Sequence, residues 1–282
     1  MTQPVPLSDP AWQRTVPRLV TPYMDEWLAG LLLRCDELNH WNSGATCAPY
    51  VQSLHLPPRL KRVVGVSALI VPPVPLLAYL IQTLAIPKSL LLATTYQSEL
   101  ARLYGDSRWN EVLLNNALIF RFCPVCIAEN RLLRRTVMLP LVACCPSHQM
   151  MFVDTCHCGS SQELFVRRAL PFTCSRCGMD WGQFPQIQAH PERIEMEHMY
   201  LVWYEFFFSR RTPSLFPRAL DLIDGCILKM KPAQARQFRK RLMKSTPEQM
   251  RDPKIKIPLS YFVRVLADLD LSPHDLQVRE AD

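Results

Sequence analysis

The chain has 282 residues, of which 49% are hydrophobic and 20% are charged, and its formal net charge is +7. This composition excludes a disordered chain and is enough to build a buried core in one or two domains. Glycine is scarce (8, against 25 prolines), and neither a G-x-G-x-x-G nor a G-x-x-x-x-G-K-[ST] run occurs. The usual nucleotide-binding loops of ATPases, kinases and Rossmann dehydrogenases are therefore excluded.

The first part of the chain is predicted to be an extended arm over residues 1–20 and a helical module over residues 21–118. Apolar residues recur at helical spacing in Asp25–Leu38, and acidic residues open that segment. Two further predicted helices, Pro75–Leu84 and Pro87–Tyr104, each begin with a proline and are separated by a two-residue turn. A short helix, a tight turn and a second helix give the shape of a helix-turn-helix.

The second helix of this pair is a poor DNA reader. A recognition helix presents Arg, Lys, Asn or Gln to base edges, but this one offers only Lys88, Gln97 and Arg102 among its leucines. We therefore expect the pair to pack into a small core of its own and to favour a protein partner over a DNA groove.

An uncharged stretch, residues 63–87, is long enough to cross a bilayer. Three prolines in its middle, Pro72, Pro73 and Pro75, would leave several backbone groups unpaired in lipid. The stretch is therefore interpreted as two short buried segments.

Residues 186–282 are predicted to form a C-terminal helical domain. Its expected helices are Pro191–Ser209, Leu215–Met230, Ala233–Lys244 and Leu259–Leu269. The first of them is aromatic nearly all round, so it is either buried or an interface. We expect Trp203, Tyr204 and Phe207 to include an anchor for a partner or a second copy of the chain, with ordinary core packing as the alternative.

A basic stripe runs through the same domain. Residues 229–256 hold ten Lys or Arg and only two acidic residues. Such a stripe favours weak, salt-sensitive contact with DNA or guide RNA, although a solvated helix face or an acidic protein partner has the same signature. The residues expected to make the contact are Arg236, Arg239, Lys240, Arg241 and Lys244.

Eight of the eleven cysteines lie between Cys123 and Cys177, mostly as close pairs. The first twenty residues are polar and rich in proline, unlike a signal peptide, so we expect a cytoplasmic protein. In a reducing compartment, clustered cysteines are typical of metal ligation rather than of disulfides. The block over residues 119–185 is therefore predicted to be a double zinc ribbon.

Two ligand sets can be written from the spacing. The first is Cys123, Cys126, Cys145 and His148, a C-x2-C knuckle paired with a C-x2-H knuckle. The second is Cys156, Cys158, Cys174 and Cys177, whose front pair is one residue short. Either a C-x-C geometry is used there or His157 replaces one thiolate, and Cys144 is a possible substitute for Cys145. Each set gives the four ligands of a structural zinc.

No catalytic residue is predicted, and we expect no enzyme activity. A catalytic zinc keeps one coordination position open for water, whereas both predicted sets are complete. The H-x-E…P-C-x-x-C arrangement of nucleobase deaminases is missing.

Two runs of residues resemble a known family. The run Pro22-x-x-Asp25-Glu26-x-Leu28-x-x-x-Leu32-x-Arg34…Asn39 looks like the opening of the TniQ/TnsD family of transposon target-selection proteins. The block Phe122-Cys123-Pro124-x-Cys126…Leu139-Pro140…Cys145-Pro146-x-His148 is similar to that family's zinc ribbon. The sequence departs from the family pattern at Gly30-Leu31, where Ser-Trp is common, at Val137-Met138, where a Trp is common, and at the C-x-C pair.

The resemblance implies a non-enzymatic adaptor in DNA transposition. Proteins of this family connect a target-recognition device to an AAA+ regulator ATPase, which recruits the transposase. Long members read a DNA attachment site themselves, whereas short members of CRISPR-associated transposons dock on an RNA-guided effector complex, sometimes as a head-to-tail dimer. The length of this chain favours the second type. The alternative is a sequence-specific DNA-binding regulator that uses the helix-turn-helix and the zinc ribbon.

Overall fold

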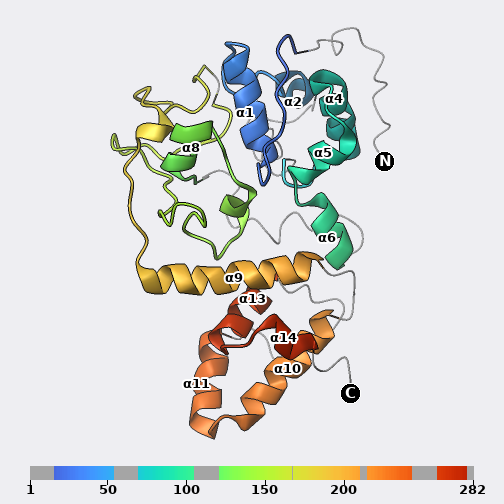
Figure 1. Ribbon diagram of the computed structural model, residues 1–282, viewed down its shortest axis with the longest axis vertical. Helices are drawn as coiled ribbons and strands as arrows, with labels where there is room; N and C mark the ends of the chain where they lie inside the picture. The colour runs from blue at the N-terminus through green and yellow to red at the C-terminus, as the bar shows by residue number, and fades with distance from the viewer. Residues whose placement is uncertain are drawn as a thin grey trace. The chain divides into compact units, whose positions relative to one another are not determined.

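The computed structural model describes residues 16–53, 69–104, 121–166, 168–209, 215–242 and 259–277. Within these residues the fold is mainly helical, and the extended segments form isolated bridges rather than a sheet (Figure 1). This confirms the predicted fold class of a helical protein with Cys/His knuckles. The predicted arm lies almost entirely outside the described residues.

Helices make up most of the regular structure of the described residues. Their bounds are α1 Leu28–Leu38, α2 Ala48–Ser53, α4 Val74–Leu84, α5 Lys88–Ala93, α6 Gln97–Tyr104, α8 Pro124–Asn130, the 3-10 turns η2 Arg135–Met138 and η3 Trp181–Gln183, α9 Pro191–Ser209, α10 Leu215–Lys229, α11 Pro232–Leu242, α13 Leu259–Asp268 and α14 Pro273–Gln277. Among the described residues, no helix combines the length and the apolarity that a bilayer crossing requires.

The chain divides into two compact units. Unit 1 takes the described residues within 16–98, 121–138 and 143–189, and unit 2 takes those within 99–104, 139–142 and 190–277. Unit 1 therefore contains α1, α2, α4, α5, α8 and the whole stretch that carries the clustered cysteines. Unit 2 contains α9 to α14.

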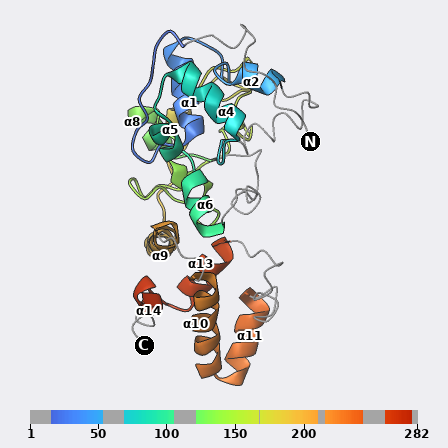
Figure 2. The same cartoon turned by 90° about the vertical axis from the view of Figure 1, so that its right-hand side faces the viewer.

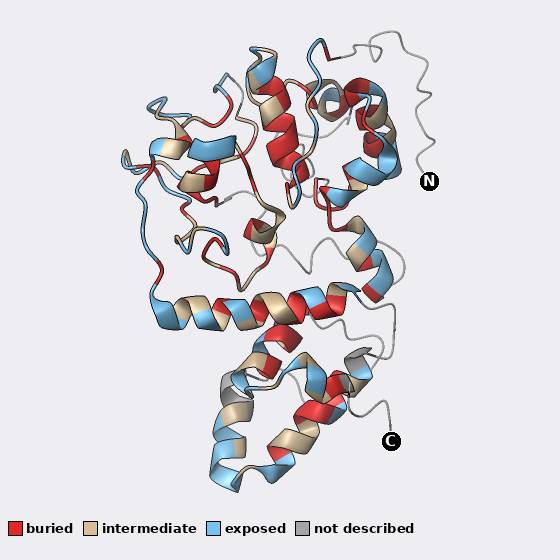
Figure 3. Cartoon of the chain, in the orientation of Figure 1, coloured by how far each residue is buried: buried red, intermediate tan, exposed pale blue. Residues whose placement is uncertain are grey.

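The core of unit 1 is built around α1. This helix is buried on nearly every side (Figure 3), and Trp27, directly before it, is fully buried with its indole N–H donating to the carbonyl of Leu69 at 3.1 Å. The backbone N–H of Trp27 donates to the carbonyl of Leu133 at 2.7 Å. Helix α1 thus lies between the other helices of the module and the segment that follows α8.

Two helix boundaries differ from the sequence prediction. Helix α1 begins at Leu28 instead of Asp25, because Asp25 adopts a φ of 61° and Glu26 forms a bridge with Arg134. The predicted helix Pro87–Tyr104 is two helices, α5 and α6. The hydroxyls of Thr94 and Thr95 donate to the carbonyls of Leu91 and Leu92 at 2.7 and 2.8 Å, which competes with helical bonding and breaks the helix.

Unit 2 is a cluster of helices. Helix α9 packs against α13 and α14, and α10 packs against the same two helices (Figure 2). The indole N–H of Trp203 in α9 donates to the carbonyl of Leu271 at 3.1 Å, which fixes the loop between α13 and α14. Ser272 and Asp275 then cap α14, where the backbone N–H of Ser272 donates to the carboxylate at 2.7 Å.

Candidate metal centres

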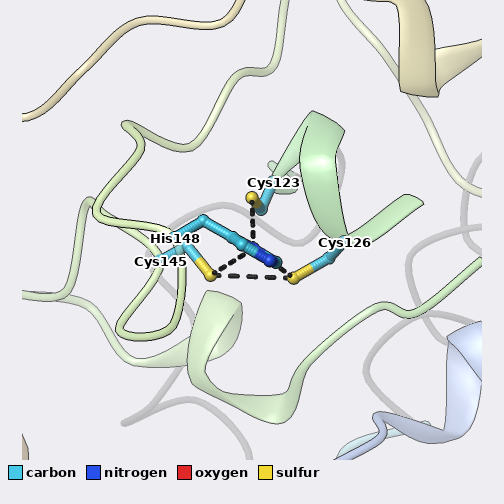
Figure 4. Close-up of side chains that lie close together, drawn as sticks. All are labelled: Cys123, Cys126, Cys145 and His148. Atoms are coloured by element: carbon cyan, nitrogen blue, oxygen red, sulfur yellow. Dashed lines mark hydrogen bonds between the residues drawn. The ribbon is translucent and has the colours of Figure 1, made fainter. Parts of the chain in front are cut away.

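The first centre is assembled from a helix start and a tight turn. Cys123 is the residue before α8, Pro124 occupies the first helical position, and Cys126 follows in the first turn. Cys145 and His148 come from a knuckle in which the N–H of Cys145 donates to the carbonyl of Met150 and the N–H of Gln149 donates back to Cys145, at 2.7 and 2.8 Å. These two local structures face each other (Figure 4).

The four ligand atoms of this set surround one point. Nδ1 of His148 lies 3.5 Å from Sγ of Cys123, 3.2 Å from Sγ of Cys126 and 3.5 Å from Sγ of Cys145. The sulfurs of Cys126 and Cys145 are 3.6 Å apart. Zinc–sulfur bonds of about 2.3 Å in a tetrahedron separate two sulfurs by about 3.8 Å. Three thiols and one imidazole at these distances therefore fit one tetrahedral zinc ion.

Two charged side chains contact the ligands from outside. Oε2 of Glu129 lies 3.1 Å from Nε2 of His148, the ring nitrogen that faces away from the sulfurs. Such a carboxylate fixes the tautomer and the orientation of a metal-binding imidazole. Nε of Arg134 donates to Sγ of Cys126 at 3.3 Å. The first centre thus has an ionic partner on a nitrogen ligand and another on a sulfur ligand.

The second centre is built from two knuckles. One carries Cys156 and Cys158, and the other carries Cys174 and Cys177. Sγ of Cys156 lies 3.6 Å from Sγ of Cys177, and Sγ of Cys158 lies 3.7 Å from Sγ of Cys174. All four sulfurs lie within 4.8 Å of one another, so they also match the edges of a zinc tetrahedron. The C-x-C pair therefore brings both of its sulfurs into the set, as predicted.

The side chain that contacts a sulfur of the second centre from outside is a neutral amide. The amide of the buried Gln162 donates to Sγ of Cys174 at 3.6 Å and accepts from the indole N–H of Trp181 at 3.0 Å. Trp181 in turn stacks on Phe122 with ring centroids 4.9 Å apart. An aromatic cluster thus supports one ligand of the second centre through a single amide side chain.

Several thiols of the two sets have displaced pKa values. Hydrogen bonding with Cys123 raises the pKa of Cys126 and lowers the pKa of Cys145. Burial acts to raise the pKa of Cys174, but the backbone N–H groups of Cys177 and Arg176 outweigh it and lower the pKa to about 6. Burial raises the pKa of Cys156 to about 12, so the shifts differ in direction between ligands of the same set.

Cys144 and His157, the two alternative ligands, lie outside the tetrads. Cys144 is buried and forms a bridge with Met151. His157 is exposed, and its Nδ1 lies 3.4 Å from Sγ of Cys156. Both tetrads are closed sets of four protein ligands, so a zinc ion held there would have no open position for water or substrate.

The expected partner residues of α9 are core residues. Trp203, Tyr204 and Phe207 are 0%, 1% and 0% exposed. Trp203 packs on Phe206 and Phe207 with ring centroids 5.7 and 5.9 Å apart. In this conformation a partner cannot reach these three side chains, and core packing, the alternative weighed for this helix, accounts for them.

The expected nucleic-acid residues lie at the edge of what the structure describes. Arg236 is exposed on α11, and most of the described side chains of this helix are exposed (Figure 3). The side chains of Arg239, Lys240 and Arg241 and the whole of Lys244 lie outside the described residues. Their role in binding stays a prediction.

Sequence reasoning missed the polar neighbours of both centres. Arg134 and Gln162 belong to no sequence motif. Each contacts its cysteine, Cys126 and Cys174 respectively, only because the chain folds back on itself. A weak signal existed for Glu129, which follows Cys126 by three residues on the same helix.

The family-like opening run has a structural explanation. The carboxylate of Glu26 is fully buried and accepts from Nε and Nη2 of Arg34 at 2.8 and 2.7 Å. The Arg34 guanidinium also covers the ring of Tyr23 at 4.0 Å. The amide of Asn39 donates to the carbonyls of Arg18 and Cys35 at 3.0 and 2.8 Å. These residues clamp the incoming segment onto α1.

The fold and the sites define a mainly helical protein with two tetrads of Cys or Cys and His that could each hold a metal ion. Comparison with known protein families matches residues 17–152 to the TniQ family. The chain therefore contains a TniQ family domain, which spans α1 to α8 and includes the first tetrad but not the second. TniQ proteins are non-catalytic proteins that act in the selection of transposition targets. No curated protein matches the chain.

Proposed function

We propose that this protein is a non-enzymatic adaptor that links a target-recognition complex to an AAA+ regulator of DNA transposition. The observation that carries the proposal is the TniQ domain over residues 17–152. The closed tetrads support it, because four protein ligands per centre suit a rigid platform and leave no position for hydrolytic chemistry.

The surface for the regulator belongs to the TniQ domain in this proposal. The aromatic face of α9 is buried, whereas the TniQ domain exposes large apolar side chains that a partner can cover. Met24 is 88% exposed, Val74 76% and Leu90 47%. Isolated apolar residues on a surface need no explanation, so each of them has to be tested by substitution.

A binding assay with the purified regulator tests this surface. Met24→Asp and Val74→Asp are expected to weaken capture of the regulator at least tenfold while the zinc content and the melting temperature stay at wild-type values. Leu170→Asp is the matched control, because Leu170 is 62% exposed but lies outside the family match. Unchanged capture by both variants would exclude these positions as the contact.

The adaptor role is tested in a reconstituted transposition reaction. Omission of the chain should abolish targeted insertion while the target-recognition complex still binds its site. We propose an RNA-guided effector as that complex. Specific binding of the isolated chain to a DNA attachment site would favour the alternative of a DNA reader, and DNA cleavage by the pure chain would contradict the adaptor role.

The basic stripe is proposed as a secondary nucleic-acid contact. Neutralisation of Z phosphates predicts a log–log salt slope of about −0.9Z on duplex DNA. A variant with Arg239, Lys240 and Arg241 changed to Gln should lose most of its weak DNA binding at low salt. Wild-type affinity in that variant would assign the stripe to a protein partner or to solvent.

A further inference from the structure

Arg134 occupies an unusual position for a side chain without a ligand atom. Its Nε donates to Sγ of Cys126 at 3.3 Å, and its Nη1 lies 3.6 Å from Oδ2 of Asp25. The side chain is mostly buried, with 21% of its surface exposed. One guanidinium therefore touches both a metal ligand and the residue that precedes the turn into α1.

The charge of the first centre gives this contact a physical role. Three thiolates, one neutral imidazole and a zinc ion have a net charge of −1, and the three cysteines are 0–3% exposed. A buried net charge is costly unless it is paired and hydrogen-bonded. A guanidinium that donates to a thiolate sulfur supplies both the opposite charge and the hydrogen bond.

The other end of the contact fixes the segment before α1. The backbone N–H of Arg135 donates to the carbonyl of Asp25 at 2.9 Å, and Nε of Arg135 lies 3.9 Å from its carboxylate. Glu26 forms a backbone bridge with Arg134, and the N–H of Trp27 donates to Leu133. The start of α1 is thus bound residue by residue to the segment that holds Arg134.

We propose that Arg134 is a positioning residue of the first metal centre and that, through it, the bound metal holds the start of α1 in place. With metal present, the charge of the centre orients the guanidinium between Cys126 and Asp25. Without metal, nothing holds Cys126 where its sulfur accepts the hydrogen bond from Arg134, so the link from that sulfur through the guanidinium to Asp25 loosens. The metal would then stabilise the helical module as well as its own knuckles.

The test resolves the two centres by pulsed alkylation. Full-length zinc-loaded protein is mixed with excess chelator, sampled with a thiol-alkylating reagent and mapped by mass spectrometry, so that each cysteine reports the opening of its own centre. Arg134→Met should speed alkylation of Cys123, Cys126 and Cys145 about tenfold or more, the usual scale for the loss of an outer-sphere partner. The cysteines of the second centre should keep their wild-type rates.

Arg131→Met is the matched control. Arg131 is an arginine of the same segment and a similar exposure, 33%, but it pairs with Asp180 at 2.6 Å and Glu37 at 3.2 Å and contacts no ligand sulfur of the first tetrad. Its substitution should leave the opening rate of the first centre unchanged. A rate increase equal to that of Arg134→Met would mean that any lost ion pair loosens the centre, and it would overturn the proposal.

Hydrogen exchange tests the link to α1. Chelation of the wild type should lower protection of residues 25–33, and Arg134→Met should lower it in the zinc-loaded protein. If Arg134→Met does not fold, Arg134→Lys and Asp25→Asn take its place, because each weakens one end of the contact. Wild-type alkylation rates in these variants, or unchanged protection of α1 after the first centre has lost its metal, would refute the proposal. None of these readouts depends on transposition, so the adaptor function can fail or hold independently.

Discussion

The two candidate metal centres of unit 1 each bring four ligand atoms together, but they differ in burial and in the side chains that contact them. In the first centre all three cysteines are buried and two charged side chains, Glu129 and Arg134, contact the ligands. In the second, Cys177 is exposed and Cys158 is partly exposed. A neutral amide donates to Sγ of Cys174, and Arg176 donates to the backbone carbonyl of Cys158 rather than to a sulfur. The charged partners thus contact ligand atoms of the more buried centre, since two of the four cysteines of the second centre are buried.

The net charge of each ligand set explains this difference. A zinc ion with four thiolates has a net charge of −2, and one with three thiolates and an imidazole has −1. Water screens the larger charge at the surface, whereas a buried charge needs a protein partner. In the role proposed above, Arg134 supplies that partner to the first centre.

The two centres are also attached to α1 by different means. The first reaches its N-terminal end through Arg134 and Asp25. The stretch of the second reaches its C-terminal end through Asp36, which accepts hydrogen bonds from the loop at Gly44 and Thr46. That loop lies on the stretch between the cysteine pairs of the second centre, since the N–H of Ser43 donates to the carbonyl of Ala169 at 2.9 Å.

Removal of one ligand from each centre should give the largest contrast. Structural zinc contributes about 10–16 kcal/mol in small zinc peptides, more than most domains have as net stability. Cys145→Ser should therefore lower the zinc content from two ions to one and unfold the TniQ domain, with loss of exchange protection in α1. Cys177→Ser should also cost one zinc ion but should leave α1 protected. Zinc analysis and hydrogen exchange measure both.

Cys144→Ser is the matched control for Cys145→Ser. Cys144 is 4% exposed and lies outside the tetrad, so the change should cost only what a buried hydroxyl costs, about 1–3 kcal/mol, and should retain both zinc ions. The reverse result, with zinc lost in Cys144→Ser and retained in Cys145→Ser, would exchange the two ligand assignments.

The link through Asp36 should appear as a pH effect of intermediate size. Burial raises the pKa of Asp36 to about 6, against hydrogen bonds from Thr46 and Gly44 that act to lower it. A carboxyl whose pKa is raised by folding stabilises the folded state below its unfolded pKa and loses that contribution as pH rises through the folded pKa. About two pKa units correspond to roughly 3 kcal/mol at most.

Comparison with Asp36→Asn isolates this effect. The free energy of unfolding of the wild type minus that of the variant should fall by up to about 3 kcal/mol between about pH 4 and about pH 6.5 and stay level above that range. Both proteins have the same metal ligands, so loss of zinc in acid cancels in the difference. A constant difference, or one that rises with pH, would show that the carboxyl ionises without cost in the folded protein.

The spacing predicted which four residues come together in each tetrad, but not the surroundings of the tetrads. The C-x2-C, C-x2-H and C-x-C spacings are local, and a knuckle needs only its own residues to place its sulfurs. The choice between Cys158 and His157 depended on the backbone path, which the spacing does not determine. Arg134 and Gln162 meet their cysteines through tertiary folding, so no local pattern marks them.

The helices show the same division between local and tertiary causes. Helix α9 has the predicted bounds, and α10, α11 and α13 begin and end within one or two residues of the prediction wherever the chain is described, because apolar periodicity and prolines mark them. The break between α5 and α6 was missed. It depends on the Thr94 and Thr95 hydroxyls and on the N–H of Tyr96, which donates to the carbonyl of Ile70 at 3.0 Å.

Glycine substitutions should give the smallest effects. Near the first centre the cost would come from crowding, and near the second it would come from backbone strain. A Cβ on Gly30 would lie 2.8 Å from Cβ of Leu133 and 3.2 Å from its backbone nitrogen, beside Arg134. A Cβ on Gly178 would meet nothing within 4 Å, but its φ of 76° is a left-handed conformation that disfavours other residues.

Gly30→Ala is therefore expected to cost about 1–3 kcal/mol through overpacking and to speed alkylation of the first centre by displacing Leu133 and Arg134. Gly178→Ala should cost roughly 1–2 kcal/mol through backbone strain and should affect the second centre alone. Gly178→Asn distinguishes strain from crowding, because asparagine tolerates the left-handed region, and it should recover most of the loss. Denaturant midpoints and centre-resolved alkylation measure all three. If Gly30→Ala left the first centre unchanged, the tight packing of α1 on the segment of Arg134 would not control that centre, and the link between them would rest on the guanidinium alone.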